Sequence, residues 1–437
     1  MDAQTAAGRT GGRLAAIGAD RVVVLAVAAV VGWWCLRLVD RGLPGRSLVD
    51  LQVYRMGGAG VGHGDLYSLA LPSNGLPYTY PPFAAALTAP LAQVPLGALV
   101  VLWTAAGVLC LAFVVGRVLA VTGVPPRRRG TVVPVVVVLS LALEPVWSTL
   151  SFGQVNLFLL ALVVGDALRP VGASQRWAGV GIGIAAGIKL TPLIFIPYLV
   201  LTGRLRAAAM ATAAFAGTVA IGFAVDPRSA TDYWTGVMWD ADRVGGVAYA
   251  GNQSTLGVLT RWGGGEPASW VWLLVAGTLS GAALLLGVLL HRRGEPALGL
   301  CLAATAMLLA SPISWDHHWV WCVPTALALL SALRHRDRAV RIGAIASWVA
   351  VFASACVWWG PESGGVELRW TLAQQVPGNG YFLAALGLLG VVLFAALPRG
   401  RRTTPADERR GRPLVRARGA APSSAVPDQD RSRVTPG

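Results

Sequence analysis

Charged side chains are scarce in this chain. They make up 13% of its 437 residues, whereas 55% of the residues are hydrophobic. Soluble domains carry about 25% charged residues, so the composition argues against a water-soluble fold. Lys189 is the only lysine, so arginine carries nearly all of the basic charge that gives the chain its net charge of +15.

Cysteine is also sparse, and its spacing excludes two classes of protein. The five cysteines lie in apolar segments without CxxC spacing, at Cys35, Cys110, Cys301, Cys322 and Cys356. Disulfide frameworks and zinc sites need a cysteine pattern that is missing here. We therefore expect buried structural thiols.

Long apolar runs fill most of the chain instead. A transmembrane helix needs about 20 mostly apolar residues, and such runs recur from residue 21 to 397. The first run has no small-residue cleavage pattern, so we interpret it as a retained span rather than a signal peptide. We predict an all-α polytopic membrane protein with one transmembrane domain (21–397), a disordered cytoplasmic arm (1–20) and a disordered basic cytoplasmic tail (398–437).

The placement of arginine predicts the orientation. Arginine clusters occur in the N-terminal arm and at 127–129, 169–176, 204–206, 292–293, 334–341 and 399–402. If all are cytoplasmic, the apolar segments pair off into about 12 spans with both termini inside. Such charge suits anionic headgroups, so we predict membrane lipids as partners and no nucleic acid. Residues 177–202 offer only two half-length pieces around Lys189, either tilted short helices or a re-entrant hairpin.

This topology places the unusual polar clusters on the outer face of a plasma membrane. The first cluster is the loop 47–82, which contains Asp50, Tyr54, Arg55 and Tyr80. Asp50 is either a solvated or capping carboxylate or a general base near an acceptor hydroxyl; the surrounding aromatic residues favour the base. The TYPPF segment at 79–83 is either an interfacial anchor or a substrate contact. We predict that Tyr54, Arg55 and Tyr80 bind substrate.

Two further clusters carry amides and the lone lysine. Gln154 and Asn156 open an apolar segment, where amides either bridge helices or bind sugar hydroxyls. Lys189 lies in the apolar stretch GIKLTP. A cation there is costly unless it is paired or hydrated, and a compact ammonium suits a phosphate. The alternative is a lysine that extends to the interface.

The last two clusters lie in later loops. Asn252 and Gln253 in GNQS offer neutral groups that suit sugar hydroxyls, whereas Asp240 and Asp242 form only a weak DxD pattern. The stretch 311–319 contains Trp315, His317 and His318. The tryptophan either stacks on a sugar or anchors at the interface, and the histidines could donate to a phosphate. A metal would need further ligands that the sequence does not place.

Taken together, these segments resemble glycosyltransferase family 87, whose members are GT-C-type membrane enzymes of actinobacteria. The resemblance spans about 21–397 and rests on DLQVY (50–54), YPPF (80–83), GQVN (153–156), GIKLTP (187–192), GNQS (251–254) and SPISWDHHW (311–319). It implies a GT-C-like helical bundle and an inverting transfer of mannose from polyprenyl-phosphate mannose. The acceptor would be a phosphatidylinositol mannoside or lipomannan, extended through an α-(1→2) linkage on the periplasmic side.

The resemblance also implies roles for single residues. The family's catalytic aspartate matches Asp50, which would deprotonate the acceptor hydroxyl. Lys189 and His317 or His318 would stabilise the charge on the leaving phosphate. Other GT-C families use a metal with two acids in this loop; here one acid is well placed, so we predict neither metal nor other cofactor, although Asp65 leaves a second acid nearby.

Other functions remain open from the sequence. A family member of the same architecture could transfer arabinofuranose from decaprenyl-phosphate arabinose. A lipid-linked sugar transporter or flippase is the alternative from another class, but transporters carry internal repeats with broken helices at matching positions, and no such repeat is evident. A purely structural scaffold would leave Lys189 and the histidine pair without a role.

Overall fold

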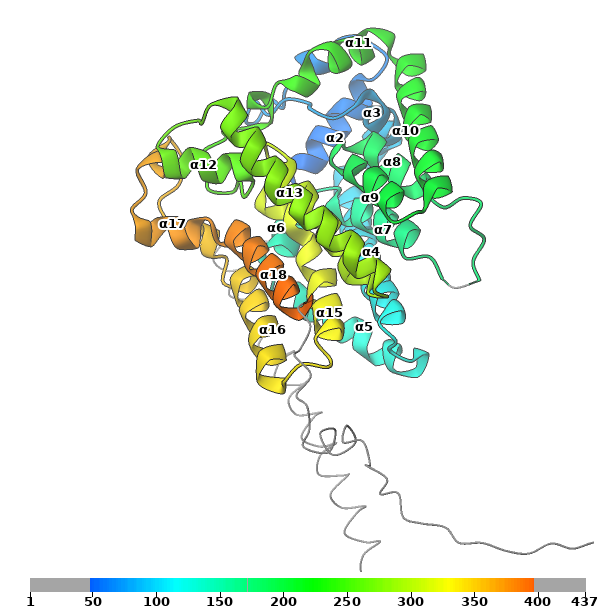
Figure 1. Ribbon diagram of the computed structural model, residues 1–437. Helices are drawn as coiled ribbons and strands as arrows, with labels where there is room; N and C mark the ends of the chain where they lie inside the picture. Colours follow the sequence, from blue (N-terminus) through cyan, green and yellow to red (C-terminus); the bar gives the residue numbers. More distant parts are fainter. Residues whose placement is uncertain (1–47, 171, 397–437) are drawn as a thin grey trace, which may run out of the picture. The chain divides into compact units, whose positions relative to one another are not determined.

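The computed structural model describes residues 48–170 and 172–396, and within these ranges the chain is helical (Figure 1). No strand occurs in them; two isolated bridges join Ala70 to Pro77 and Asn252 to Trp315. This confirms the all-α prediction for the described part. The predicted arm (1–20), the first span and the tail (398–437) lie outside the described residues.

Three helices are long and apolar enough to cross a bilayer singly. They are α4 (Leu96–Val121), α10 (Leu205–Val225) and α13 (Ser269–Arg292). Two bent pairs pass the same test together: α5 (Pro126–Ser140) with α6 (Glu144–Phe152), bent by 78°, and α17 (Leu372–Gly378) with α18 (Gly380–Ala396), bent by 69°. By length and composition the described residues therefore contain three to five spans, and the expected 12 are not confirmed.

The remaining helices are shorter. They are α2 (Val49–Gly60), α3 (Pro82–Thr88), α7 (Asn156–Ala167), α8 (Val180–Ile188), α9 (Phe195–Leu201), α11 (Pro227–Thr235), α12 (Thr255–Gly263), α14 (Pro296–Ala310), α15 (Cys322–Ala332) and α16 (Arg338–Ala353). Brief 3₁₀ turns connect them, among them η1 (Leu66–Ser68), η2 (Ala89–Gln93), η3 (Thr191–Ile194), η4 (Val237–Trp239), η5 (Asp242–Val244), η6 (Asp316–Trp321), η7 (Cys356–Trp358) and η8 (Val366–Arg369).

The outer faces of the long helices remain apolar. On α4, Val101, Leu102 and Leu109 are 66%, 62% and 70% exposed, and α13 presents Leu274 and Leu285 in the same way. Soluble proteins rarely expose apolar surface on this scale, whereas a bilayer accepts it. These faces support a membrane protein, in agreement with the composition.

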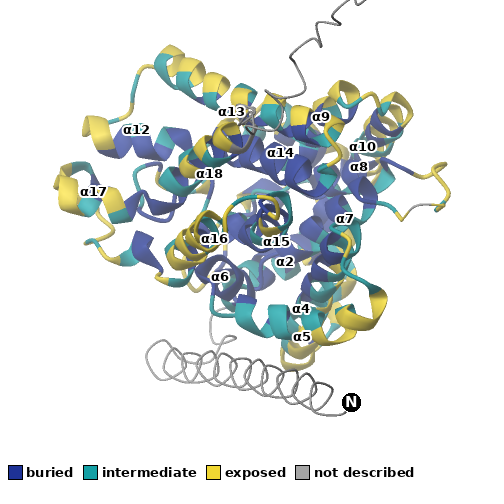
Figure 2. Cartoon of the chain, turned by 60° about the horizontal axis from the view of Figure 1, so that its bottom comes forward, coloured by how far each residue is buried: buried dark blue, intermediate teal, exposed yellow. Residues whose placement is uncertain are grey.

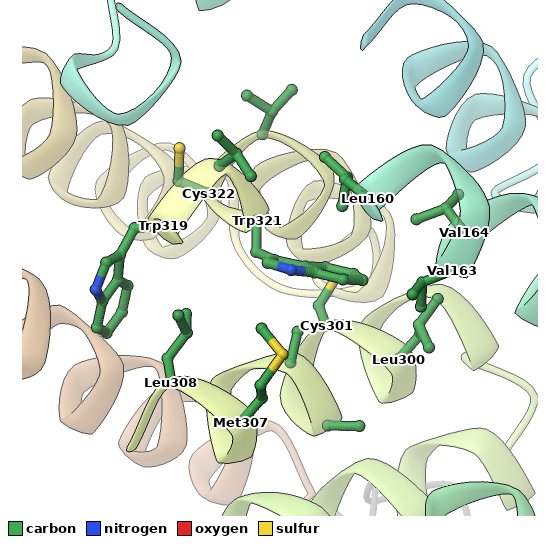
Figure 3. Packing of buried hydrophobic residues seen from close by; sticks show 14 of the residues in the cluster. Leu160, Val163, Val164, Leu300, Cys301, Met307, Leu308, Trp319, Trp321 and Cys322 are labelled. Carbon is green, nitrogen blue, oxygen red and sulfur yellow. The ribbon is translucent and has the colours of Figure 1, made fainter. Parts of the chain in front are cut away.

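Helix α14 forms the centre of the packed core. Every residue from Ala297 to Leu309 is buried, and Figure 2 shows α14 in dark blue among its neighbours. Figure 3 shows Trp321, at the end of η6, between Leu160 and Val163 of α7 and Cys301 and Met307 of α14. This packing anchors η6, which carries the histidine pair.

Residues 177–202 form two short helical pieces, as predicted. Helix α8 ends at Ile188, and the chain resumes as η3 and α9. Lys189 lies at the break in extended conformation (φ −147°, ψ 131°). The lone lysine is therefore held on non-helical backbone between two short helical pieces.

Candidate active site

Asp50 lies in the first turn of α2, and a close contact places an amide beside it. Gly153 ends α6 with a φ of +69°, and a Cβ there would lie 2.7 Å from the Cβ of Leu51. Glycine therefore satisfies both the backbone angle and the contact between α2 and the turn before α7. The next residue, Gln154, is thereby held close enough to hydrogen-bond the Asp50 carboxyl.

The environment of Asp50 makes it a stronger base than an exposed aspartate. Burial raises the pKa of its carboxyl, and the charge of Asp316 adds to this. His317, the hydrogen bond from Gln154 and Lys189 lower the pKa, but burial dominates. A base accepts protons best when its pKa approaches the working pH, so this setting suits proton abstraction.

Two tyrosines extend the network from Gln154. The Tyr54 hydroxyl donates to Oε1 of Gln154 at 3.0 Å and lies 3.1 Å from the Tyr80 hydroxyl. The two rings pack edge to face, with centroids 5.1 Å apart. Since Oε1 of Gln154 is occupied by Tyr54, its amide nitrogen is oriented toward the carboxyl of Asp50. Tyr54 and Tyr80 therefore fix the amide that contacts the candidate base.

Lys189 and His318 form the cationic side of the same site. The Lys189 Nζ lies 2.7 Å from Nε2 of His318, 3.5 Å from Oδ1 of Asn156 and 5.8 Å from the centre of the Tyr80 ring. Burial lowers the pKa of Lys189 to about 8, although the Asp50 charge opposes this. Burial, Lys189 and His317 lower the pKa of His318. At neutral pH a neutral imidazole therefore accepts from a charged ammonium.

A large apolar cavity adjoins this site. Its volume is about 720 Å³, and Tyr54 and Tyr80 belong to its lining. The other walls come from α3, α4, α7 and α8, with Trp103, Phe113 and Phe158 among them. The lining continues past the end of α7 to Arg169, and α7 has 12 residues, so the cavity follows a helix about 18 Å long at 1.5 Å per residue. An apolar chain fits such a space.

Comparison with known proteins finds similar sequences over most of this chain. The model of glycosyltransferase family 87 matches residues 78–312. A relative from Mycobacterium tuberculosis (strain CDC 1551 / Oshkosh) is 32% identical over 401 residues, which cover 88% of each chain. The chain belongs to glycosyltransferase family 87.

The names of the relatives describe one kind of reaction. The relative above is a polyprenol-phosphate-mannose-dependent alpha-(1-2)-phosphatidylinositol pentamannoside mannosyltransferase. A second, from Mycolicibacterium smegmatis, is a polyprenol-phosphate-mannose-dependent alpha-(1-2)-phosphatidylinositol mannoside mannosyltransferase, 33% identical over 416 residues that cover 87% of this chain and 91% of the relative. No solved structure shows a significant match. This member of family 87 is therefore a glycosyltransferase.

Most of the predicted site residues lie close together in the structure of this family 87 protein. Those that the structure brings together are Asp50, Tyr54, Tyr80, Gln154, Asn156, Lys189, His317 and His318. They come from segments far apart in the sequence. Among the described residues, no three His, Cys, Asp or Glu side chains cluster in a way that could hold a metal ion.

Asn252 and Gln253 were predicted to bind sugar hydroxyls, but the structure places them inside the protein. Both are fully buried. The Asn252 amide donates to the carbonyls of Val247 and Pro312, and its oxygen accepts from two backbone amides. Gln253 donates to two further carbonyls and accepts from the amide of Tyr381. Their hydrogen-bonding groups are thus occupied by the chain itself, which corrects their interpretation as sugar ligands: they brace the loop that carries η6.

Arg55 and Trp315 also lie apart from the contacts around Asp50. The Arg55 guanidinium donates to the carbonyls of Leu91, Ala92 and Val94, so it holds η2 against α2. Trp315 packs beside Tyr249, with ring centroids 6.0 Å apart. The predicted substrate contacts of both side chains stay predictions.

One residue of the site was missed from the sequence. Asp316 is buried beside His317, with 3.3 Å between its Oδ1 and the Nδ1 of the imidazole. It directly precedes the histidine pair in SWDHHW, and that adjacency was the available signal. An acid next to a histidine in sequence is common, so only the burial of both makes the pair notable.

Proposed function

We propose that this chain is an inverting mannosyltransferase. It would transfer mannose from a polyprenyl-phosphate donor to a glycolipid of the phosphatidylinositol mannoside type, with the α-(1→2) linkage named for its relatives. The observation that carries the proposal is the half-buried Asp50, held by Gln154 and acted on by Lys189 and His317, next to a large apolar cavity. A base, a cationic site and a lipid-sized space are the parts that this reaction requires.

In the proposed reaction, Asp50 takes the proton of the acceptor hydroxyl. The acceptor oxygen then bonds to the anomeric carbon from the side opposite the phosphate, while the bond from that carbon to the phosphate oxygen breaks. The electron pair leaves with the phosphate, where Lys189 offsets the growing negative charge. Preorganised donors of this kind are worth most in a site that excludes water.

The cavity supports a lipid-linked donor in particular. A soluble nucleotide sugar would gain nothing from a lining of aromatic and aliphatic side chains, whereas the part of a polyprenyl chain that enters the cavity gains about 25 cal/mol per Å² of apolar surface that it buries. Tyr80 belongs to the cavity lining and also lies under the Lys189 ammonium. A lipid in the cavity would therefore carry its phosphate toward Lys189.

The first test is mannosyl transfer by purified protein in detergent. Polyprenyl-phosphate mannose and polyprenyl-phosphate arabinose are offered in parallel with a phosphatidylinositol mannoside acceptor. We expect transfer from the mannose donor, and a loss of about 10²-fold or more in Asp50→Asn, because general base catalysis contributes about 10²–10⁴.

The matched control is Asp65→Asn, because Asp65 is an exposed acid just before η1 and should be dispensable. The anomeric configuration of the product, read by NMR, tests inversion, and added chelator tests metal independence. Transfer from the arabinose donor alone would show that the donor sugar is arabinose rather than mannose. An unimpaired Asp50→Asn enzyme would contradict the role of Asp50 as the base.

A further inference from the structure

Helix α17 turns its polar side toward the protein and its apolar side outward. Gln375 is 8% exposed, whereas Leu372 and Val376 are 79% and 54% exposed, and Ala373 is exposed beside them. Figure 2 shows the exposed surface of α17 at the edge of the structure. In a helix that faces water, the apolar stripe packs on the core and the polar side faces solvent. Helix α17 has the reverse arrangement, which an apolar environment favours and water does not.

Hydrogen bonds on the polar side fix this orientation of α17. The Gln375 side chain donates to the Arg261 carbonyl of α12 at 2.9 Å, and the Arg261 guanidinium donates to Oδ1 of Asn379 at 2.9 Å and 2.6 Å. The Gln253 amide donates to the Gly378 carbonyl at 2.8 Å. A rotation of the helix would leave these buried groups unpaired, which is costly. The apolar side of α17 is therefore held away from the protein.

The connection of α17 to α18 places it at the edge of the membrane. Only Asn379 separates the two helices, and they are bent by 69° (Figure 1). Helix α18 is apolar and has 17 residues. At 1.5 Å per residue it is about 26 Å long, close to the roughly 30 Å of the hydrocarbon core. Helix α18 can therefore cross almost the whole bilayer by itself, and the bend directs α17 along the membrane surface.

Exposed tryptophans lie beside α17. Trp262 is 56% exposed and directly follows Arg261, whose carbonyl accepts from Gln375. Trp359 is 66% exposed and directly follows η7, which contacts α17. Tryptophan is enriched where a membrane meets water. The surroundings of α17 therefore have the composition of a membrane interface.

The loop that binds α17 also holds the segment that carries the histidine pair. The backbone amide of Gln253 donates to the Ser314 carbonyl at 2.8 Å, and the backbone amide of Asp316 donates to the Gly251 carbonyl at 2.8 Å. Asp316 is the first residue of η6, which contains both histidines. Residues 251–253 therefore connect α17 to η6 through hydrogen bonds on both sides.

We propose that α17 is an interfacial helix whose partner is the lipid of the leaflet on the side of the candidate site. Leu372, Ala373 and Val376 insert among the acyl chains there, to the depth of about 5–10 Å that such helices reach. The helix thereby holds η6, through residues 251–253, at the level of the membrane surface. This positioning of η6 rests on the proposed function, whereas the lipid contact does not.

The lipid contact is tested by fluorescence quenching in phosphatidylcholine vesicles. A bimane label is attached to Leu372→Cys, and the matched control is Asp232→Cys, at an exposed acid on α11. We expect lipids with nitroxide-labelled acyl chains to quench the label at position 372 and not the label at position 232. Aqueous iodide should do the reverse. The unaltered chain, treated with the same reagent, gives the background from the native cysteines.

The opposite pattern would overturn the proposal. If iodide quenches the label at position 372 and the nitroxide lipids do not, α17 faces water. Because Leu372 is 79% exposed, its replacement removes little packing, and thermal unfolding in detergent should match that of the unaltered chain.

The positioning of η6 is tested by mannosyl transfer with Leu372→Asp in vesicles and in detergent. A charge is costly among acyl chains, so we expect kcat/KM for the donor to fall about 5-fold in vesicles. In detergent it should stay unchanged, because a micelle rearranges around the charge. Leu372→Met keeps the apolar side chain and should match the unaltered enzyme in both media.

Two results would contradict the positioning of η6. Equal loss in both media would show a structural defect, and normal transfer by Leu372→Asp in vesicles would show that the lipid contact does not affect the site. Absence of transfer by the unaltered enzyme would instead contradict the proposed function, while the quenching experiment would still decide the lipid contact.

Discussion

At the scale of single residues, the position of Lys189 shows how its neighbours control its charge. The ammonium lies between His318, Asn156 and the Tyr80 ring, and none of these carries a negative charge at neutral pH. Burial therefore lowers the pKa of Lys189 to about 8. A lysine in this state gains from an arriving phosphate, because the Asp50 charge only partly offsets the effect of burial and the phosphate adds a further counter-charge.

The pH dependence of donor use should follow from this pKa. Below about 8, Lys189 is charged and attracts the donor phosphate; above it, the charge is lost. We expect kcat/KM for the donor to fall as pH rises through about 8, because this ratio reports the free enzyme and the donor phosphodiester does not titrate there. The measurement is a pH profile of donor kcat/KM.

Two variants test the assignment. Lys189→Met should lower kcat by about 10²-fold, the magnitude reported for loss of one oxyanion donor, and should remove the alkaline decline. Lys189→Arg keeps the charge, so its decline should move to higher pH even if its absolute rate is reduced. A fully active Lys189→Met enzyme would contradict the role of Lys189.

At the scale of elements, the glycines of α8 explain how Lys189 is positioned. Gly183 and Gly187, and Gly179 just before the helix, follow one another at four-residue intervals and face α10. A Cβ at Gly183 would lie 2.3 Å from the Ala211 carbonyl oxygen, and one at Gly187 2.1 Å from the Thr218 hydroxyl. Small residues at this spacing let membrane helices approach closely. The close packing of α8 on α10 fixes where α8 ends, and it thereby fixes the position of Lys189, the residue that directly follows α8.

This packing predicts a sharp difference between two glycines. Gly183→Ala should force α8 away from α10 and destabilise the protein by about 1–3 kcal/mol, the usual cost of overpacking. Gly217 lies on α10 with open space around its Cβ position, so Gly217→Ala should be neutral or slightly stabilising. Thermal unfolding in detergent measures both. Equal melting temperatures would refute the close contact.

Activity should follow the same order. If α8 positions the lysine, Gly183→Ala should also weaken donor use at temperatures where the protein is still folded, with the unaltered enzyme and Gly217→Ala as references. A destabilised Gly183→Ala enzyme with normal donor kcat/KM would show that the contact between α8 and α10 does not position Lys189.

At the scale of the whole molecule, the helices near the candidate site and the arginine cluster 127–129 lie toward different ends of the structure. Helices α2, α3, α11 and α12 lie toward one end in Figure 1, and α5 lies toward the other. The α5 helix begins at the arginine cluster 127–129. By the positive-inside rule this arrangement favours the outward-facing site that the sequence predicts.

Cysteine labelling can test this orientation. Trp239 is 74% exposed in the loop 226–268, and Gln175 is exposed in the arginine-rich loop 169–176. We expect an impermeant maleimide to label Trp239→Cys in intact cells and Gln175→Cys only after permeabilisation, with the unaltered chain as background. The reverse pattern would invert the topology and move the reaction to the cytoplasmic side.

The sequence alone was sufficient for the class of protein, its family and several of the residues around Asp50. These conclusions depend on local properties: the length of apolar runs, the scarcity of charge, and short motifs such as GIKLTP, which places the only lysine in an apolar stretch. The two short pieces around Lys189 could be predicted for the same reason.

Only the tertiary structure decided which polar residues face the site. Asn252, Gln253 and Gln154 carry the same amide group, so the sequence cannot tell them apart. In the structure, the amide groups of Asn252 and Gln253 donate to backbone carbonyls. The amide of Gln154 contacts Tyr54 and Asp50 instead. The cavity and the Asp316–His317 pair were likewise invisible, because each arises where segments distant in sequence meet. Hydrogen bonding and burial depend on that meeting in space, which no local pattern encodes.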